Sequence, residues 1–468
     1  MSKKAKLRGK DLSQLGYRDA AIRSLAMIIV GRAYKYESKE TKMDILQKII
    51  EKPEDYLGNP TLAPIAIKIA DKKAKREIYE FKDKPFQIYG AEGIEDGAKK
   101  QMRQAMSLPI TVDGALMPDA HQGYGLPIGG VLATQDAIIP YGVGVDIGCR
   151  MCMSIFEARK DFLTKNTDLL KTILTDNTRF GRSTFEDNKR DDDFLDRDEF
   201  KDLALLQHLK DKAYRQIGSS GGGNHFVDFG VVVITNENNE FGLPLGEYLA
   251  VLSHSGSRGF GAKIANTYTR IAKDKRNLPK EVAHLSWLYM NESEGQEYWM
   301  AMNMAGDYAS ACHHHIHKRI SNALGMKSLA MVENHHNFAW KEQLADGRNV
   351  FVHRKGATPA KKGELGVIPG SMASPAYIVR GLGAENAINS ASHGAGRLFS
   401  RRKAKNQFTN KMLREELNRK GVELIGGGLD EAPFAYKNIH DVMSAQQDLV
   451  DIVGAFHPKI VRMDESED

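Results

Sequence analysis

Apolar residues recur every three or four positions in two stretches near the start of the chain, residues 19–34 and residues 41–50. This spacing places apolar side chains along one face of an α-helix, so both stretches are predicted to be helical. The charged run 72–84 is interpreted as a further helix or a linker, and Pro85 ends it because proline has no amide hydrogen for a helix. We therefore expect a helical N-terminal region over residues 1–85.

After residue 85 the pattern changes to glycine-rich loops between short apolar runs. Residues 295–324 carry the spacing of a long helix. Strands are predicted at residues 129–133, 227–235 and 350–353. Because strands and helices follow one another without a regular rhythm, we predict an α+β fold with mixed sheets rather than a doubly wound sheet. Residues 86–468 are expected to form this second body, with a short, disordered acidic tail at 464–468.

Two charged or histidine-rich segments are interpreted as surface features. Residues 186–199 are dense in charged side chains with little periodicity, which is typical of a solvated loop or an exposed helix. Residues 312–317 read Cys-His-His-His-Ile-His, but successive helix residues point about 100° apart and cannot all face one ion. We expect this tract to be a helix surface beside the main cleft. Contact with a substrate through its imidazoles is the alternative.

Composition places the chain among globular proteins. Hydrophobic residues make up 41% and charged residues 27%, and no run of about 18 apolar residues could cross a bilayer. Three cysteines are too few for a disulfide framework, and the basic first ten residues lead into no secretory signal. We therefore expect a cytoplasmic protein without a membrane partner. The net charge of +6 is compatible with a polyanionic partner, but it is also common among proteins that bind no nucleic acid.

Polar residues gather in glycine-framed clusters, where the backbone can approach a ligand closely. One carboxylate, one thiolate and three imidazoles in these clusters form the inventory of a metal site with open positions. The five residues are Asp146, Cys149, His225, His254 and His336. Taken singly, each would more often be structural. Thiolate and imidazole suit zinc, whereas phosphoryl transfer with a carboxylate suits magnesium or manganese, so the residue types leave the metal open.

Seven ordered motifs resemble those of the RtcB family of RNA 3′-phosphate ligases. They are MPDAHQGYGLPIGG at residues 117–130, VDIGC at 145–149, GGGNHF at 221–226, HSGSRG at 254–259, HRKGAT at 353–358, PGSM at 369–372 and HGAGR at 393–397. The similarity covers roughly residues 86–450, whereas residues 1–85 stand outside it. The resemblance implies an RtcB-like catalytic domain over residues 86–468, preceded by a helical extension.

The resemblance further implies two Mn²⁺ ions that share Cys149. Their implied ligands are Asp146, Cys149, His225, His254 and His336, and His335 is the neighbouring alternative to His336. It also implies that His393 is the catalytic nucleophile: a neutral imidazole nitrogen attacks the α-phosphate of GTP and forms a phosphoramidate. Outside the motif, a lone histidine in a glycine loop would more often be structural.

A guanylate pocket is implied as well. Its residues would be Asn224, Asp228, Ser371, Met372, Gly394, Ala395, Gly396, Arg397 and Tyr436. Candidate phosphate or RNA contacts are Arg258, Arg354 and Lys355, whereas Arg401 and Arg402 are equally consistent with plain surface charge.

Three positions depart from the family pattern and leave the nucleotide preference open. Asp228 stands where glutamate is frequent, and Arg150 stands where glycine is usual. The C-terminal lysine of the family has no clear counterpart, with Lys459, Arg462 and Met463 near its place.

The activity implied by the resemblance is the joining of an RNA 3′-phosphate or 2′,3′-cyclic phosphate end to a 5′-hydroxyl end. GTP and manganese would be the cofactors, RNA the partner, and a helper protein a further candidate partner. Two alternatives remain open. One is a nucleic-acid end-capping guanylyltransferase, and the other is a non-catalytic RNA-end-binding protein.

Overall fold

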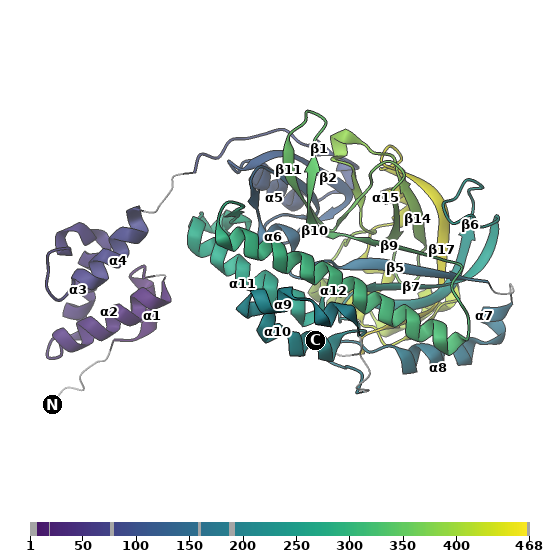
Figure 1. The fold of residues 1–468 in the computed structure, drawn as a ribbon, viewed down its shortest axis with the longest axis horizontal. Helices are drawn as coiled ribbons and strands as arrows, with labels where there is room; N and C mark the ends of the chain where they lie inside the picture. The colour runs from purple at the N-terminus through teal and green to yellow at the C-terminus, as the bar shows by residue number, and fades with distance from the viewer. Residues whose placement is uncertain (1–6, 18, 75–78, 158–160, 187–191, 466–468) are drawn as a thin grey trace. The chain divides into compact units, whose positions relative to one another are not determined.

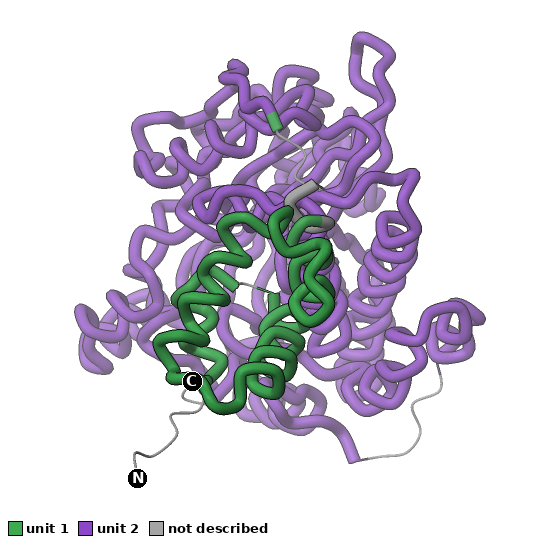
Figure 2. Tube along the Cα trace, turned by 90° about the vertical axis from the view of Figure 1, so that its left-hand side faces the viewer, with its two compact units in different colours: residues 1–79 green, residues 80–468 purple. Residues whose placement is uncertain are grey.

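The computed structural model describes residues 7–17, 19–74, 79–157, 161–186 and 192–465. The chain divides into two compact units, residues 1–79 and residues 80–468 (Figures 1 and 2). The division falls within the charged run 72–84, of which residues 75–78 lie outside the described residues. The assignment of residues 1–85 and 86–468 to separate domains stays a prediction.

Unit 1 consists of short helices around an apolar core of its own. The α-helices are α1 (Gly9–Gln14), α2 (Ala20–Ala33), α3 (Lys39–Glu51) and α4 (Ala63–Ala74). The Asp19 carboxylate accepts hydrogen bonds from the first amides of α2, and the Ser38 hydroxyl accepts one at the start of α3, which satisfies amides that lack a partner within the helix. The two helices predicted at 19–34 and 41–50 are therefore confirmed.

The larger sheet of unit 2 curls until its edge strands meet. Its strand order is β13 (Leu365–Pro369), β14 (Ala376–Gly381), β17 (Val450–Met463), β6 (Phe226–Ile234), β7 (Gly246–Ser255), β5 (Arg150–Phe156) and β9 (Ala330–His335), with β16 (Glu423–Ile425) beside β17. The Asn334 side chain of β9 accepts a hydrogen bond of 2.8 Å from the Val367 amide of β13. This contact joins the two edges, so the sheet approaches a closed barrel.

Alternation along the strands separates the two faces of this sheet. Met151, Met153 and Leu252 belong to the apolar cluster on the inner face, whereas Phe229 and Val251 belong to the cluster on the outer face. Two helices cover the outer face, α8 (Thr167–Asn177) and the long α12 (Ser293–Leu324) (Figure 1). Since side chains alternate between faces, neighbouring residues of one strand serve different parts of the molecule.

A second sheet lies beside the first and contributes the other wall of the site. Its strand order is β1 (Gln87–Ile88), β2 (Thr111–His121), β3 (Ile128–Thr134), β11 (Asn349–Lys355) and β10 (Asn337–Gln343). Two short pairs complete the strands: β12 (Ala357–Pro359) with β15 (Ser390–Ser392), and β4 (Ala137–Ile138) with β8 (Leu288–Tyr289). β10 and β11 form an antiparallel hairpin.

The long helix α12 packs against two other helices of unit 2. A core of apolar side chains joins α12 to α10 (Ala204–Gln216) and α11 (Arg258–Arg276). The remaining α-helices are α5 (Asp96–Met106), α6 (Pro140–Val143), α7 (Phe162–Lys165), α9 (Glu199–Asp202), α13 (Arg401–Gln407), α14 (Asn410–Lys420) and α15 (Ile439–Ser444). Among the described residues, no helix is both long and apolar enough to span a membrane.

The predicted α+β class with mixed sheets is confirmed, and so are its main elements. The strands expected at 129–133, 227–235 and 350–353 correspond to β3, β6 and β11, and the helix expected at 295–324 is α12. The tail expected at 464–468 begins with Asp464, whose carbonyl accepts a hydrogen bond from the Gly427 amide. Residues 466–468 lie outside the described residues.

Two surface expectations need correction. The segment 186–199 is not wholly solvated, because Phe194 and Leu195 are buried in the core around α12; its residues 187–191 lie outside the described residues. The histidine tract is not a surface either, since His313 and His317 are buried between α12 and the large sheet. Both errors have the same cause: charge and histidine content do not show which face of an element packs inward.

Candidate active site

The five predicted metal ligands meet at one end of the large sheet. Cys149 immediately precedes β5 and His225 immediately precedes β6, while His254 lies near the end of β7 and His336 directly follows β9. Because β7 runs antiparallel to β5 and β6, and β9 antiparallel to β5, these positions share one edge. Asp146 joins them from the loop before β5. The hydrogen-bond register of four strands thus gathers residues that are up to 190 positions apart.

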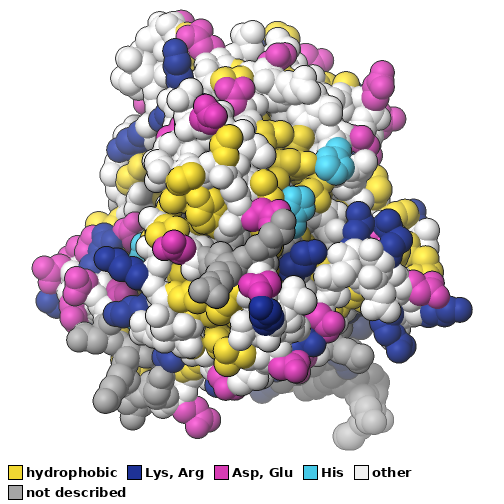
Figure 3. Space-filling model, turned by 90° about the vertical axis from the view of Figure 1, so that its right-hand side faces the viewer, with side chains coloured by type: hydrophobic (Ala, Val, Ile, Leu, Met, Phe, Trp, Pro, Cys, Tyr) yellow, Lys and Arg dark blue, Asp and Glu magenta, His cyan; other side chains and the backbone are white. Residues whose placement is uncertain are grey.

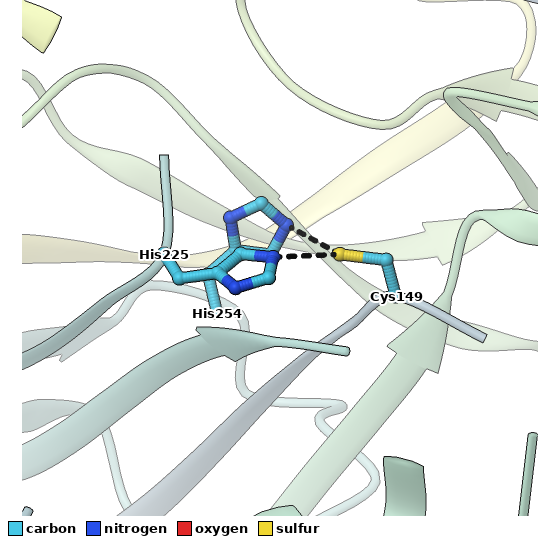
Figure 4. A group of neighbouring side chains, drawn as sticks. All are labelled: Cys149, His225 and His254. Carbon is cyan, nitrogen blue, oxygen red and sulfur yellow. Dashed lines mark hydrogen bonds between the residues drawn. The ribbon is translucent and has the colours of Figure 1, made fainter. Parts of the chain in front are cut away.

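Cys149 lies at the centre of this cluster (Figure 4). Its Sγ is 3.4 Å from His225 Nε2 and 3.2 Å from His254 Nε2. His225 Nε2 is also 3.0 Å from Asp146 Oδ2, and His254 Nε2 is 3.2 Å from His336 Nε2. The cluster therefore divides into two halves that share the thiol, one with the carboxylate and His225, the other with His254 and His336.

These spacings fit a metal centre. Ligand atoms 2.0–2.3 Å from one tetrahedral ion lie about 3.5 Å from each other, close to the 3.2–3.4 Å between neighbouring sulfur and nitrogen atoms here. The outer ring nitrogen of His254 lies 3.0 Å from the Asn224 carbonyl, to which it donates its proton. That contact leaves the lone pair of His254 on Nε2, facing Cys149, as is usual for metal-bound histidines.

Electrostatics keep the His254 and His336 imidazoles neutral and the Cys149 thiol protonated in the absence of a cation. Burial lowers the pKa of His254 to about 3 and holds the pKa of His336 well below its usual value. Burial, together with the nearby Asp146 carboxylate, raises the pKa of Cys149. For Asp146 itself, burial would raise the pKa, but the hydrogen bond and charge of His225 outweigh it and lower the pKa. A divalent cation would stabilise the thiolate that this environment otherwise disfavours.

One glycine makes room for the Asp146 carboxylate. A Cβ atom on Gly256 would lie 2.2 Å from both carboxylate oxygens of Asp146, closer than any real contact. The adjacent Ser257 amide donates a 3.0 Å hydrogen bond to Asp146 Oδ1. The HSGSRG motif therefore supplies both His254 and the space that orients the carboxylate.

His393 stands beside the metal cluster on the loop after β15. The centroid of its ring is 5.0 Å from that of His336. Its Nδ1 donates a 2.6 Å hydrogen bond to the fully buried Asp119 carboxylate, which also accepts from the His393 amide at 3.1 Å. Burial would raise the pKa of Asp119, but the hydrogen bond from His393 outweighs it and the pKa is lowered. Because Nδ1 keeps its proton, the lone pair of His393 is on Nε2.

Gly396 is required for this close approach. Its φ is +74°, and a Cβ atom there would lie 2.0 Å from the Asp119 carbonyl oxygen. Any other residue would push the loop of His393 away from β2. The glycine pattern of HGAGR thus has a steric reason.

A cavity of about 280 Å³ lies next to His393, near the lower end of the range for small-molecule sites. His393 and His254 line it, and so do all nine predicted nucleotide contacts: Asn224, Asp228, Ser371, Met372, Gly394, Ala395, Gly396, Arg397 and Tyr436. Met463 and Arg401 line it as well. The cavity therefore connects the candidate nucleophile, one edge of the metal cluster and the expected nucleotide residues.

Asp228 brings an unpartnered carboxylate oxygen to this cavity. Its side chain is buried, and Oδ1 has no hydrogen-bond partner among the described residues. Burial raises the pKa of Asp228 well above its ordinary value. A buried polar atom without a partner is costly, so a ligand that supplies hydrogen-bond donors at this point would be favoured.

Arg397 is tied into the cavity wall. Its guanidinium lies over the Tyr436 ring, 5.0 Å from the centroid, and donates to Glu431 at 3.1 Å. It also donates to the Asp430 carbonyl. The Tyr436 hydroxyl donates to Glu431 as well. Arg397 thus holds the wall together through contacts within the protein.

Three predicted phosphate or RNA contacts do not line the cavity. Arg354 is fully buried and donates to Glu342 at 2.6 Å. Lys355 donates to the Tyr124 and Leu126 carbonyls, and burial lowers its pKa to about 7. Arg258, at the start of α11, donates to the Ser219 hydroxyl and the Gly181 carbonyl. Their phosphate or RNA contacts stay predictions.

Two neighbours of the cluster point away from it. The His335 ring packs against Phe338 and Trp340, so the geometry favours His336 over His335 as a ligand. Arg150 lies on the opposite side of β5, where it contacts Glu333 at 3.2 Å and the Gly306 carbonyl. The cation that follows Cys149 is therefore directed to α12 rather than to the metal loop.

Asp119 is the residue that the sequence analysis did not assign to the site. Its signal was present, since Asp119 belongs to the MPDAHQG motif. His121 from the same motif also lines the cavity, and Glu431 lies in its wall. Asp119 and His393 are 274 residues apart, and only the pairing of loops in space reveals that one orients the other.

Comparison with known proteins agrees with these motifs. The sequence profile described as tRNA-splicing ligase RtcB matches residues 101–464. The RNA-splicing ligase RtcB of Escherichia coli is 32% identical over 394 residues, covering 77% of this chain and 92% of that protein. The tRNA-splicing ligase RtcB of Thermococcus kodakarensis is 31% identical over 452 residues, covering 79% and 93%. The metal cluster, Asp119 and His393 all fall within the matched residues.

Proposed function

Because the chain belongs to the RtcB family, we propose that it is an RNA ligase that joins a 3′-phosphate or 2′,3′-cyclic phosphate end to a 5′-hydroxyl end, using GTP and manganese. One observation carries the proposal. His393 stands between the Cys149 cluster and a cavity lined by every expected nucleotide residue. A nucleophile placed between a metal centre and a nucleotide site is the arrangement that nucleotidyl transfer requires.

Asp146, Cys149, His225, His254 and His336 would hold the manganese ions. When bound, such a pair of cations neutralises phosphate charge and orients the reacting oxygens. The protein contributes the spacing of 3.2–3.4 Å between neighbouring ligand atoms and the neutral imidazoles described above. Asn224, through its carbonyl, fixes the orientation of His254.

His393 Nε2 would attack the α-phosphorus of GTP, with pyrophosphate as the leaving group. The bond between phosphorus and the bridging oxygen breaks as the nitrogen–phosphorus bond forms, giving a covalent histidine–GMP. Asp119 is a positioning residue in this step, because its carboxylate accepts only and so keeps the proton of His393 on Nδ1. Nε2 then presents its lone pair without prior deprotonation.

The cavity would hold the guanine base and ribose. Guanine offers N1–H and a 2-amino group, and Asp228 offers an unpartnered carboxylate oxygen, so the two edges are complementary. Adenine has no hydrogen on N1 and no 2-amino group. This donor–acceptor match supports GTP as the nucleotide, even though Asp228 is one methylene shorter than the glutamate frequent at this position.

In the joining steps, GMP would pass from His393 to the RNA 3′-phosphate, and the 5′-hydroxyl would then displace GMP to form a 3′,5′-phosphodiester. A 2′,3′-cyclic phosphate would first be opened to a 3′-phosphate. Each displacement needs in-line placement and charge neutralisation more than further covalent assistance.

Incubation with α-labelled GTP and Mn²⁺ tests the first step. We expect covalent label on the wild-type chain, none on His393→Ala, and undiminished label on His440→Ala, an exposed histidine outside the cavity. Removal of metal by a chelator should abolish the label, and added Mn²⁺ should restore it. Label that persists in His393→Ala would overturn the proposed nucleophile.

A ligation assay then separates the alternatives. RNA with 3′-phosphate and 5′-hydroxyl ends should give a longer product free of GMP. Accumulation of RNA that ends in GMP, without joining, would indicate a capping guanylyltransferase. RNA binding without any covalent label would indicate a non-catalytic end-binding protein.

A further inference from the structure

Opposite faces of the large sheet carry two different groups of metal-ligating side chains. Leu252 and His254 of β7 line the nucleotide cavity, whereas Ser253 between them contacts α12 on the other face. Cys152 of β5 is paired with Ser253 across the strands and shares its face. Cys152 is therefore separated by the sheet from the site at Cys149.

Helix α12 places two imidazoles over Cys152. His313 and His317 are four residues apart and so lie on one side of the helix. One nitrogen of each ring and Cys152 Sγ lie within 4.8 Å of one another, and all three side chains are at most 4% exposed. The intervening His314 and His315 point elsewhere, toward Glu333 and Asp192.

The two rings are oriented as metal-bound histidines are. His313 Nε2 donates to the Ser255 carbonyl at 3.2 Å, and His317 Nδ1 is 2.8 Å from the Ser154 hydroxyl. The other two nitrogens, His313 Nδ1 and His317 Nε2, converge on Ser253 Oγ at 2.7 Å and 2.8 Å. Histidine ligands commonly have the far ring nitrogen held by a carbonyl or hydroxyl in this way.

We propose that Cys152, His313 and His317 bind one zinc ion. One thiolate and two imidazoles are ligands that zinc prefers in a tetrahedral set. On binding, the Cys152 thiol releases its proton to solvent. The ion would link α12 to β5, which directly follows Cys149 and pairs with β7, which contains His254. It would therefore stabilise the strands of the active site without contacting a substrate.

The same contacts also allow a metal-free network. In that arrangement Ser253 donates to His313 Nδ1 and accepts from His317 Nε2, and the Ser154 hydroxyl donates to His317 Nδ1. Each nitrogen then has a partner without an ion. The two arrangements differ in metal content and in the bond to Cys152 sulfur, and both can be measured.

Cobalt substitution in the full chain distinguishes them. The Cys149→Ala variant removes the thiolate of the proposed catalytic centre. This protein, produced with Co²⁺ as the available metal, should bind cobalt with a thiolate-to-cobalt charge-transfer absorption band, since a cobalt ion on the four remaining ligands of the catalytic centre would give no such band. Adding Cys152→Ser should abolish the band. The matched control, Cys149→Ala with Cys312→Ser, changes another buried cysteine of the same region and should retain it.

X-ray absorption at the cobalt edge of the Cys149→Ala protein provides a second readout that needs no substitution in the cluster. One sulfur and two imidazole nitrogens around the ion are the expected result. Absence of the charge-transfer band, its persistence after Cys152→Ser, or a coordination shell without sulfur would overturn the proposal and establish the hydrogen-bonded network. None of these results depends on whether the chain ligates RNA.

Discussion

The Asp119 carboxylate accepts hydrogen bonds from the His393 ring and from the His393 and Gly394 amides. It is fully buried, and its pKa is lowered because these contacts outweigh the effect of burial. A charged acceptor in this position fixes both the ring orientation and the position of its proton. The chemistry proposed for His393 therefore depends on the charge of a residue in β2.

Asp119→Asn should retain the shape of the side chain but remove the charge that fixes the imidazole proton of His393 on Nδ1. All three hydrogen bonds are accepted by one atom, Asp119 Oδ2, so the asparagine oxygen would take that place. A neutral oxygen holds the proton on Nδ1 less strongly than a carboxylate does, so more of the imidazole would carry its proton on Nε2, which blocks attack. We expect the rate of guanylylation to fall about 10²- to 10⁴-fold, the range for a misplaced catalytic proton. Single-turnover labelling at several GTP concentrations measures this.

The KM for GTP should change little, because Asp119 does not line the cavity. Asp113→Asn, on the same strand, is the matched control and should label at the wild-type rate. An unchanged rate in Asp119→Asn would show that the hydrogen bond is structural only.

Asp228→Asn should weaken the preference for guanine. Asparagine replaces one acceptor oxygen by an NH₂ donor, which cannot pair with the donor edge of the base, whereas the carboxylate presents acceptors only. A loss of about tenfold in the ratio of GTP to ATP labelling is expected, corresponding to about 1.4 kcal/mol. Competition between the two labelled nucleotides measures it, with the exposed Asp451→Asn as control. A ratio equal to that of the wild type would remove Asp228 from base recognition.

The same substitution should stabilise the empty protein. An acid whose pKa is raised by folding, as for Asp228, contributes full stability below the pKa of the unfolded chain and loses it as the pH rises. At pH 7 the wild type therefore carries a penalty that Asn lacks, and the penalty disappears toward pH 4. Thermal melting from pH 4 to pH 8 without nucleotide should show a higher Tm for Asp228→Asn only at the upper end. A difference in Tm between variant and wild type that widens toward pH 4 would contradict a raised pKa for Asp228.

At the scale of the elements, the β10–β11 hairpin contains a buried ion pair, and one of its partners belongs to a family motif. Arg354, in the HRKGAT string, is fully buried and paired with Glu342. Arg354→Ala should cost about 3–5 kcal/mol, because it leaves the buried Glu342 charge with only the exposed Lys361 ammonium, 3.8 Å away. Denaturant unfolding measures the loss.

The control for Arg354 lies on the same hairpin. Arg348 is paired with Asp346 at the surface, and such exposed pairs contribute at most about 1 kcal/mol. Arg348→Ala should therefore be nearly neutral. Equal losses from the two substitutions would contradict the distinction between them.

The pattern of apolar residues predicted two long elements closely. The helix expected at 295–324 differs from α12 by two residues at its start, and the strand expected at 227–235 differs from β6 by one at each end. The same pattern could not show which strands pair or which helix packs against which face of the sheet. Whether Cys152 and Ser253 face α12 or the cavity depends on strand register and on which helix crosses the sheet, and neither leaves a trace in local spacing.

The site was predictable to the extent that it lies in short motifs. The five candidate ligands lie in glycine-framed strings, the nine nucleotide residues were implied by the family resemblance, and the structure brings each group together. Their roles stay predictions. The contact between Asp119 and His393 was not found, because the two motifs show no relation until the sheets are in place. Arg354 and Lys355 also lie in a motif, and there the motif residues pack within a buried strand; their phosphate or RNA contacts stay predictions.

At the scale of the whole molecule, positive charge is concentrated in one unit. Residues 1–79 contain 18 Lys and Arg against 10 Asp and Glu, whereas residues 80–468 contain 48 against 50. The face drawn in Figure 3 shows acidic and basic side chains interspersed, in agreement with the near balance of the larger unit. The excess that could attract RNA at long range therefore lies in the unit without the candidate site.

A chain limited to residues 80–468 should separate chemistry from RNA affinity. All candidate site residues lie in this part, the family match begins at residue 101, and the apolar core of unit 1 contains no residue of unit 2. We therefore expect it to fold and to accept label from GTP at the full rate. Its affinity for RNA should fall at low salt, and the slope of log affinity against log salt should decrease by about 0.7–0.9 for each RNA phosphate that unit 1 neutralises in the full chain. The full chain measured in parallel is the reference, since it shares every catalytic residue. Loss of label on truncation would show that unit 1 supports the active site, and an unchanged salt slope would show that its charge does not engage RNA.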